Sequence, residues 1–214
     1  MKKVILTIAA IVLMVSNLSA QEDNNGDTRD HLRFGVKAGV NLSNLYDSQK
    51  ENYNADAKLG FVGGVFISIP ILEKIIGIQP EVLFSQKGFS ASGSVLGADV
   101  SFTRTTNYID IPIFATFKPI ENITLLFGPQ YSYLLKQKDV FDNPISDIVV
   151  ESEFENENIR KNIFSLTGGA DFNLNNFVLS VRAGWDLFNN NGNGTTETPR
   201  YKNVWGGLTL GVRL

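Results

Sequence analysis

Charged residues recur in this chain at alternate positions of segments whose intervening positions are apolar. Such groups would either line a pore or a ligand site, or pair with one another and plug an interior. Charges in a narrow interior are tolerated only when they are paired, so we favour a plug of ion pairs. Glu81 and Lys87 lie on one strand face but about 20 Å apart, so each needs a partner from another strand. The predicted network comprises Arg33, Lys37, Glu81, Lys87, Asp110, Asp171, Arg182, Asp186 and Arg213.

The residue types that support catalysis are almost absent. The chain has one histidine, His31, and no cysteine, so a Ser–His–Asp triad, a cysteine nucleophile and a thiolate metal site each lack a usable member. His31 also precedes the first predicted strand, at the opposite end from the long connections. We therefore predict no catalytic residue, no cofactor, no metal and no enzyme activity.

An acidic run lies in the longest predicted connection, at 136–161. Oxygen-rich clusters of this kind can bind Ca²⁺, but the spacing here does not match an EF-hand loop. We interpret the run as a solvated loop, and the alternation over 150–155 predicts that the strands on either side continue as a hairpin beyond the bilayer. The run consists of Asp139, Asp142, Asp147, Glu151, Glu153, Glu155 and Glu157.

The elements that must position these groups are strands. Apolar and polar residues alternate through segments of about ten residues, which is typical of membrane-spanning β-strands. Because backbone groups in hydrocarbon must all be paired, such strands have to close into a barrel. The alternating segments are 34–42, 61–69, 76–84, 109–117, 123–135, 164–172, 177–187 and 204–214.

The connections between these segments alternate in length. Long ones at 43–58, 88–104, 136–161 and 189–202 alternate with short ones at 70–74, 118–122 and 173–176. Outer-membrane barrels have this arrangement. The predicted fold is therefore all-β: an eight-stranded antiparallel up-and-down transmembrane β-barrel with four long outer loops and short periplasmic turns.

The direction in which the apolar faces point separates this fold from a soluble barrel such as a lipocalin, which turns its apolar residues inward. The polar face of the strands is rich in glycine, which suits a narrow, curved interior. The opposite face carries large apolar residues, which suit lipid, where a central Lys or Arg would cost about 2–4 kcal/mol. We therefore predict that the apolar face contacts lipid.

Three details of the pattern carry further expectations. Pro80 and Pro129 fall within strands and lack an N–H for the ladder, so we expect a bulge or a strand end at each. Apolar residues on the polar face imply either a partly apolar core or slips in register; they are Val62, Phe66, Leu83, Leu126 and Trp205. We predict that an aromatic girdle at the membrane interfaces includes Tyr131, Tyr133, Trp185, Tyr201 and Trp205.

The N-terminal residues are expected to lie outside the barrel. A positive start and an apolar run too short to span a membrane predict a cleaved signal peptide at 1–20. The polar stretch 21–31 predicts a flexible periplasmic leader, which leaves 32–214 as one barrel domain. The formal net charge is −3, and no basic patch indicates a nucleic-acid partner. The predicted location is the bacterial outer membrane.

Three motifs carry a family resemblance. The segments 35–41 (GVKAGVN), 78–88 (IQPEVLFSQKG) and 107–113 (NYIDIPI) together resemble the PorT-like outer membrane protein β-barrel family of Gram-negative bacteria. The resemblance extends over 32–214 and implies an outer-membrane barrel. It also implies, as a possible partner, the secretion or gliding apparatus to which the founding member of that family is linked.

These observations favour a structural or interaction role. The barrel would be embedded in outer-membrane lipid and would present loops to an envelope partner or ligand. The most specific are the loops 43–58 and 136–161, with Phe141, Phe154 and the acidic run as contacts. Two alternatives remain open from the sequence. One is a narrow porin-like passage for small solutes, and the other is a soluble periplasmic barrel that binds an apolar ligand.

Overall fold

The computed structural model describes residues 31–46, 55–72, 75–95, 98–142, 148–152, 160–190 and 201–214. The predicted signal segment 1–20 and the leader up to residue 30 lie outside this part. No helix within it is long and apolar enough to cross a membrane. The strands are β1 (Arg33–Tyr46), β2 (Ala55–Leu72), β3 (Ile76–Val95), β4 (Ala98–Ile120), β5 (Ile123–Asp142), β6 (Ile148–Ser152), β7 (Asn162–Leu174), β8 (Phe177–Asp186) and β9 (Lys202–Arg213).

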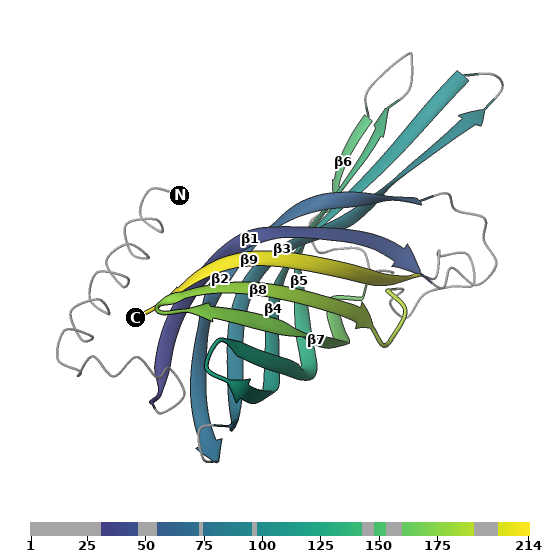
Figure 1. The fold of residues 1–214 in the computed structure, drawn as a ribbon. Helices are drawn as coiled ribbons and strands as arrows, with labels where there is room; N and C mark the ends of the chain where they lie inside the picture. The colour runs from purple at the N-terminus through teal and green to yellow at the C-terminus, as the bar shows by residue number, and fades with distance from the viewer. Residues whose placement is uncertain are drawn as a thin grey trace, which may run out of the picture.

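The strands form a closed antiparallel ring (Figure 1). Each ring strand pairs with its neighbours in sequence, except that β5 pairs with β7 across the intervening β6, and β1 pairs with β9 to close the ring. The short strand β6 pairs with β5 outside the ring. The ring therefore contains eight strands, as predicted, and the expected fold class is confirmed.

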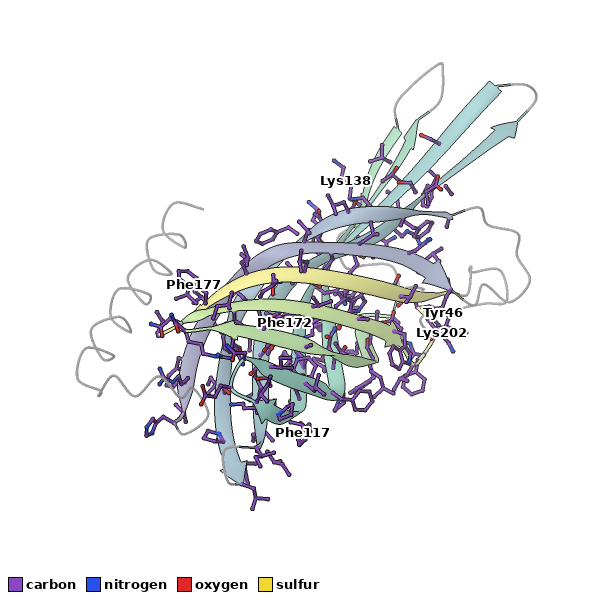
Figure 2. The ribbon with its side chains drawn as sticks, in the orientation of Figure 1. Tyr46, Phe117, Lys138, Phe172, Phe177 and Lys202 are labelled. Carbon is purple, nitrogen blue, oxygen red and sulfur yellow. The ribbon has the colours of Figure 1, made fainter. Side chains whose placement is uncertain are left out.

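Side chains alternate between the outside and the inside of the ring, as the sequence predicts. Phe117, Phe172 and Phe177 lie on the outside of the barrel and are exposed (Figure 2). Leu210, the most exposed of the large apolar residues described, keeps 68% of its surface accessible. An exterior covered by such residues suits hydrocarbon rather than water, so the predicted direction of the apolar faces is confirmed.

The interior is partly apolar. Of the two readings left open by the sequence, a mixed core and slips in register, the structure has the mixed core, because the apolar residues on the polar face are all buried. They are Val62, Phe66, Leu83, Leu126 and Trp205. Trp205 and Tyr201 are each only 7% exposed, so their predicted place in a lipid-facing girdle is wrong, whereas Trp185 and Tyr133 do face outward.

The bulges expected at the two prolines are also absent. Pro80 pairs with Ile113 of β4, and Pro129 pairs with Leu166 of β7. On the opposite side of each proline the strand pairing is interrupted, between β2 and β3 at Pro80 and between β4 and β5 at Pro129. In both cases the pairing resumes in the same register. The missing N–H therefore interrupts one ladder locally, and the pairs on either side hold the register.

The second long connection, 88–104, is not a loop. Strands β3 and β4 remain paired through Val95 and Ala98, so 88–104 is a hairpin that continues the barrel wall. The neighbouring strand β5 also continues to Asp142, where Gln137–Phe141 pairs with β6. The four strands β3–β6 thus project beyond the rest of the barrel on the side away from the short turns (Figure 1). We call this part the projecting sheet.

Candidate functional site: the lumen and its two ends

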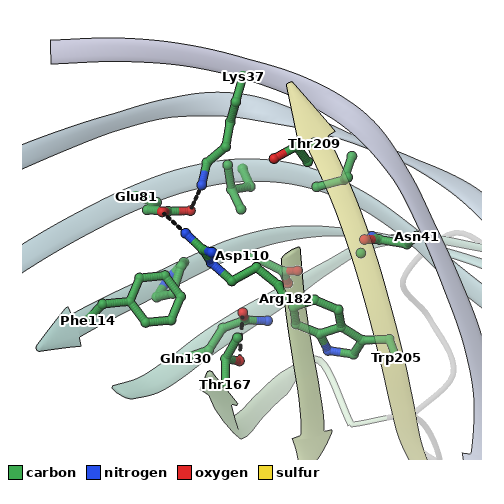
Figure 3. A pocket seen from close by; sticks show the side chains of 14 residues that line it. Lys37, Asn41, Glu81, Asp110, Phe114, Gln130, Thr167, Arg182, Trp205 and Thr209 are labelled. Carbon is green, nitrogen blue, oxygen red and sulfur yellow. Dashed lines mark hydrogen bonds and ion pairs between the residues drawn. The ribbon is translucent and has the colours of Figure 1, made fainter. Parts of the chain in front are cut away.

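The centre of the lumen holds four charged side chains from four strands. Lys37 of β1 lies 2.6 Å from Glu81 of β3, and Arg182 of β8 lies 2.7 Å from Asp171 of β7. Arg182 also approaches Glu81 at 3.5 Å, which joins the two pairs (Figure 3). Two of the four are cations and two are anions, so the group is neutral overall. Gln79 links the two carboxylates, because its Nε2 donates to Glu81 at 2.9 Å and to Asp171 at 3.3 Å.

A second charged group lies further towards the projecting sheet. Lys87 of β3 pairs with Asp110 of β4 at 2.9 Å, and Asp110 also accepts a hydrogen bond from Ser85 at 2.6 Å. Asp186 of β8 is held by donors instead, since Ser165 and Asn203 each donate to it at 2.8 Å. The ammonium of Lys87 lies over the rings of Tyr108 and Trp205, at 5.0 and 5.2 Å from their centroids.

Between the two groups lies a cavity of about 20 Å³. A water molecule needs about 10–15 Å³ measured in this way, so the space is large enough for one water molecule and for nothing larger. Figure 3 shows the side chains that surround it, including Trp205, Thr209 and Gln130. Packed side chains and paired charges therefore fill the middle of the lumen.

The outer end of the lumen is closed by Arg104. Its guanidinium makes a two-pronged contact with Asp139 of β5, at 2.8 and 2.7 Å, and donates to the hydroxyl of Tyr201 at 3.1 Å. The Arg104 guanidinium also lies within 6 Å of the ring centroids of Phe89, Phe102 and Tyr201. Arg104 thus links the projecting sheet to Tyr201, next to β9, through partly buried contacts.

The electrostatics of this end follow from the same contacts. Burial alone would lower the pKa of Arg104, but the hydrogen bonds to Asp139 raise it above its ordinary value. Burial raises the pKa of Tyr201, and the neighbouring Arg104 only partly opposes that effect. Sequence reasoning placed Asp139 in a solvated acidic run and did not select Arg104. The alternation of the predicted strand would place Gln137 and Asp139 on the outward face, and they turn inward only because the β4–β5 register shifts by one residue between Asn107 and Tyr108.

The end with the short turns has a different balance of charge. Arg213 is buried, and its Nη2 donates to Asn173 at 2.6 Å. Arg33 is half-buried, and Lys118 donates to Ser68 at 3.2 Å. Within the described part of the chain, neither Arg33 nor Arg213 contacts a carboxylate. The predicted set of charges is therefore paired in the centre and uncompensated at this end.

The remaining candidates do not assemble into a site. His31 is exposed and lies just before β1, at the end of the barrel with the short turns. Among the described residues no cluster of metal-ligating side chains is present. Much of the predicted acidic run and the proposed contact Phe154 lie outside the described residues, as do the side chain of Phe141 and residues 47–54 of the first long loop.

Comparison with known proteins agrees with the fold. The attachment invasion locus protein Ail of Yersinia pestis is 14% identical over 86% of this chain and 99% of that one, with a TM-score of 0.50. Neisserial surface protein A is 11% identical over 86% of this chain and 100% of that one, with a TM-score of 0.49. No curated protein matches the chain.

Sequence identities of 14% and 11% support a shared fold and carry no information about a shared function. The broader relationship comes from the model of a protein family described as the outer membrane protein beta-barrel domain, which matches residues 19–191. That range covers most of the chain and all the ring strands except β9. The protein therefore belongs to the outer membrane protein beta-barrel domain family and is a barrel of the bacterial outer membrane.

Proposed function

We propose that this protein is a non-conducting anchor that holds the projecting sheet at the cell surface for an envelope partner. The observation that carries the proposal is the contrast between the two halves of the molecule. Paired charges fill the middle of the lumen, around a cavity of about 20 Å³. The strands beyond it are longer than a membrane crossing needs, since β4 runs for 23 residues against about 9–11 for a span.

The filled lumen argues against the narrow porin-like passage. A solute would have to break the Lys37–Glu81 and Arg182–Asp171 pairs and then pass the aromatic side chains around Arg104. Each buried pair can be separated only at the cost of leaving charges without partners, about 3–5 kcal/mol. The outward direction of the apolar faces argues equally against a soluble barrel with an apolar ligand inside.

The projecting sheet has the properties of a binding platform. Its backbone is paired from β3 through to β6, Arg104 and Asp139 form an ion pair between β4 and β5, and Arg104 also donates to Tyr201 beside β9. A surface held in this way loses little conformational entropy when it binds, which favours affinity. The partners proposed are outer-membrane lipid around the apolar belt and an envelope protein complex at the sheet. The PorT-like resemblance suggests that this complex serves secretion or motility.

Two measurements test the proposal. In planar bilayers the purified protein is expected to give no steady conductance, and regular channel steps would overturn the non-conducting role. The second measurement replaces residues 92–101 with Asn-Gly, which suits a two-residue hairpin turn between the paired residues Ala91 and Phe102. We expect this variant to keep the heat-dependent gel shift of a closed barrel and to lose co-purifying envelope proteins.

The matched control removes the same length from another outer connection by replacing 191–200 with Asn-Gly. It should retain the co-purifying proteins that the 92–101 variant loses. Equal recovery of partners with both shortened proteins would show that the projecting sheet is not the platform.

A further inference from the structure

Arg213 is a buried guanidinium whose hydrogen-bonding capacity is largely unused. Only 2% of its surface is exposed, and Nη2 alone has an acceptor, the Oδ1 of Asn173 at 2.6 Å. Its Nε and Nη1 are buried without a partner. A buried donor left unmatched costs the full price of its desolvation, and more when it is charged. Arg213 therefore has a buried, positively charged guanidinium in which two nitrogen donors lack an acceptor.

A second arginine lies beside it. In the β1–β9 register Arg213 is opposite Gly35, and Arg33 lies two residues earlier on the same inward face of β1. The positive charge of Arg33 acts directly on Arg213, and the Nε of Arg33 is also buried without a partner. Two like charges placed together, each with a donor unused, are unfavourable unless an anion lies between them.

The described surroundings of Arg213 offer no carboxylate that is still without a partner. The carboxylate that acts on Arg213 is that of Asp171, and it is already engaged by Arg182 at 2.7 Å. Within the described residues, neither Arg33 nor Arg213 forms an ion pair, in contrast to the paired charges at the centre of the lumen.

We propose that Arg33 and Arg213 form a binding site for a single oxyanion, a carboxylate or a phosphate, at the periplasmic end of the lumen. The planar fork of an arginine matches two oxygens of such a group. Two sources share this chemistry. One is the chain itself, because the stretch just before β1 contains Glu22, Asp23, Asp27 and Asp30. The other is a free phosphate or phosphate-bearing molecule in the periplasm.

The test uses the full chain without the predicted signal segment 1–20, folded in detergent, and inorganic phosphate as the probe. The measured quantity is the unfolding midpoint in phosphate and in chloride at equal ionic strength. A second protein has its leader carboxylates neutralised by Glu22→Gln, Asp23→Asn, Asp27→Asn and Asp30→Asn. If phosphate raises the midpoint of both proteins, the anion is free in solution. The leader supplies the anion if two results occur together: the neutralised protein has a lower unfolding midpoint in chloride than the unmodified one, and phosphate raises the midpoint of the neutralised protein only.

Arg213→Gln should abolish the response to phosphate in whichever protein shows it, and Arg160→Gln, a charge-matched change near the outer end of the barrel, should preserve it. If Arg213→Gln fails to fold, the half-exposed Arg33→Gln tests the same site, with loss of most of the response expected. The proposal is overturned if phosphate changes neither protein and the leader substitutions leave the midpoint in chloride unaltered. A response that persists in the Arg33 or Arg213 variant would overturn it equally.

Discussion

Gly184 of β8 lies directly against the indole of Trp205 on β9. A Cβ added at Gly184 would approach the indole Cζ2 of Trp205 to 2.6 Å and its Nε1 to 2.9 Å. The two residues are partners in the β8–β9 register, and both face the lumen. The absence of a side chain at position 184 is therefore what allows a tryptophan to fill this part of the interior.

Gly184→Val should destabilise the barrel by about 1–3 kcal/mol, the usual cost of overpacking a filled core. Denaturant unfolding of the refolded protein, followed by the heat-dependent gel shift, measures the change. Gly206→Val is the matched control, because a Cβ there would meet only the carbonyl oxygen of Arg182, at 3.8 Å. If the two variants lose the same stability, the contact with Trp205 is not the reason why position 184 requires glycine.

Arg182→Met should destabilise the barrel strongly, by about 3–5 kcal/mol, because it leaves Asp171 and Glu81 buried with too few positive partners. Equilibrium unfolding in urea measures the loss. The control is Lys138→Met, a change of the same charge and similar length on the β5 extension outside the ring. If the two substitutions cost the same, the central ion pairs do not hold the lumen together.

The two tryptophans should respond differently to lipid. Trp185 is 38% exposed on the outer face and Trp205 is 7% exposed in the lumen. Since the chain has only these two tryptophans, Trp205→Phe and Trp185→Phe each leave a single fluorophore. In bilayers containing brominated lipid, we expect strong quenching of Trp185 and little of Trp205. The reverse result would mean that the facing of the strands is inverted.

Tyr201 should ionise only at a pH above its ordinary range, because burial raises its pKa. A group with a raised pKa in the folded state adds stability below its unfolded pKa, and that stability disappears as the pH rises through the folded value. Stability should thus decline on the alkaline side, and the decline should be smaller in Tyr201→Phe. The tyrosinate absorbance of the wild type minus that of the variant gives the pKa directly, and a value in the ordinary range would contradict the buried position.

The sequence by itself determined which face of each strand points to lipid. Successive side chains of a strand point to opposite sides, so alternation such as that of 177–187 identifies both faces without knowledge of the partner strands. The same local rule placed Arg182 and Glu81 inside. The lengths of the short turns then indicated the order of the strands, because adjacent antiparallel strands need only a few residues between them.

Only the tertiary structure decided which residues meet. Whether Glu81 contacts Lys37, Arg182 or Arg213 depends on the stagger between strands, which involves residues far apart in sequence and leaves no periodic signal. The contact between Arg104 and Asp139 was hidden for the same reason. Both residues lie in polar stretches that resemble loops in the sequence, and only the pairing of β4 with β5 shows that they are strand residues. It also hid the fact that no carboxylate contacts Arg213 among the described residues, because a local pattern records the charge of each side chain and not the charge of its neighbours across the lumen.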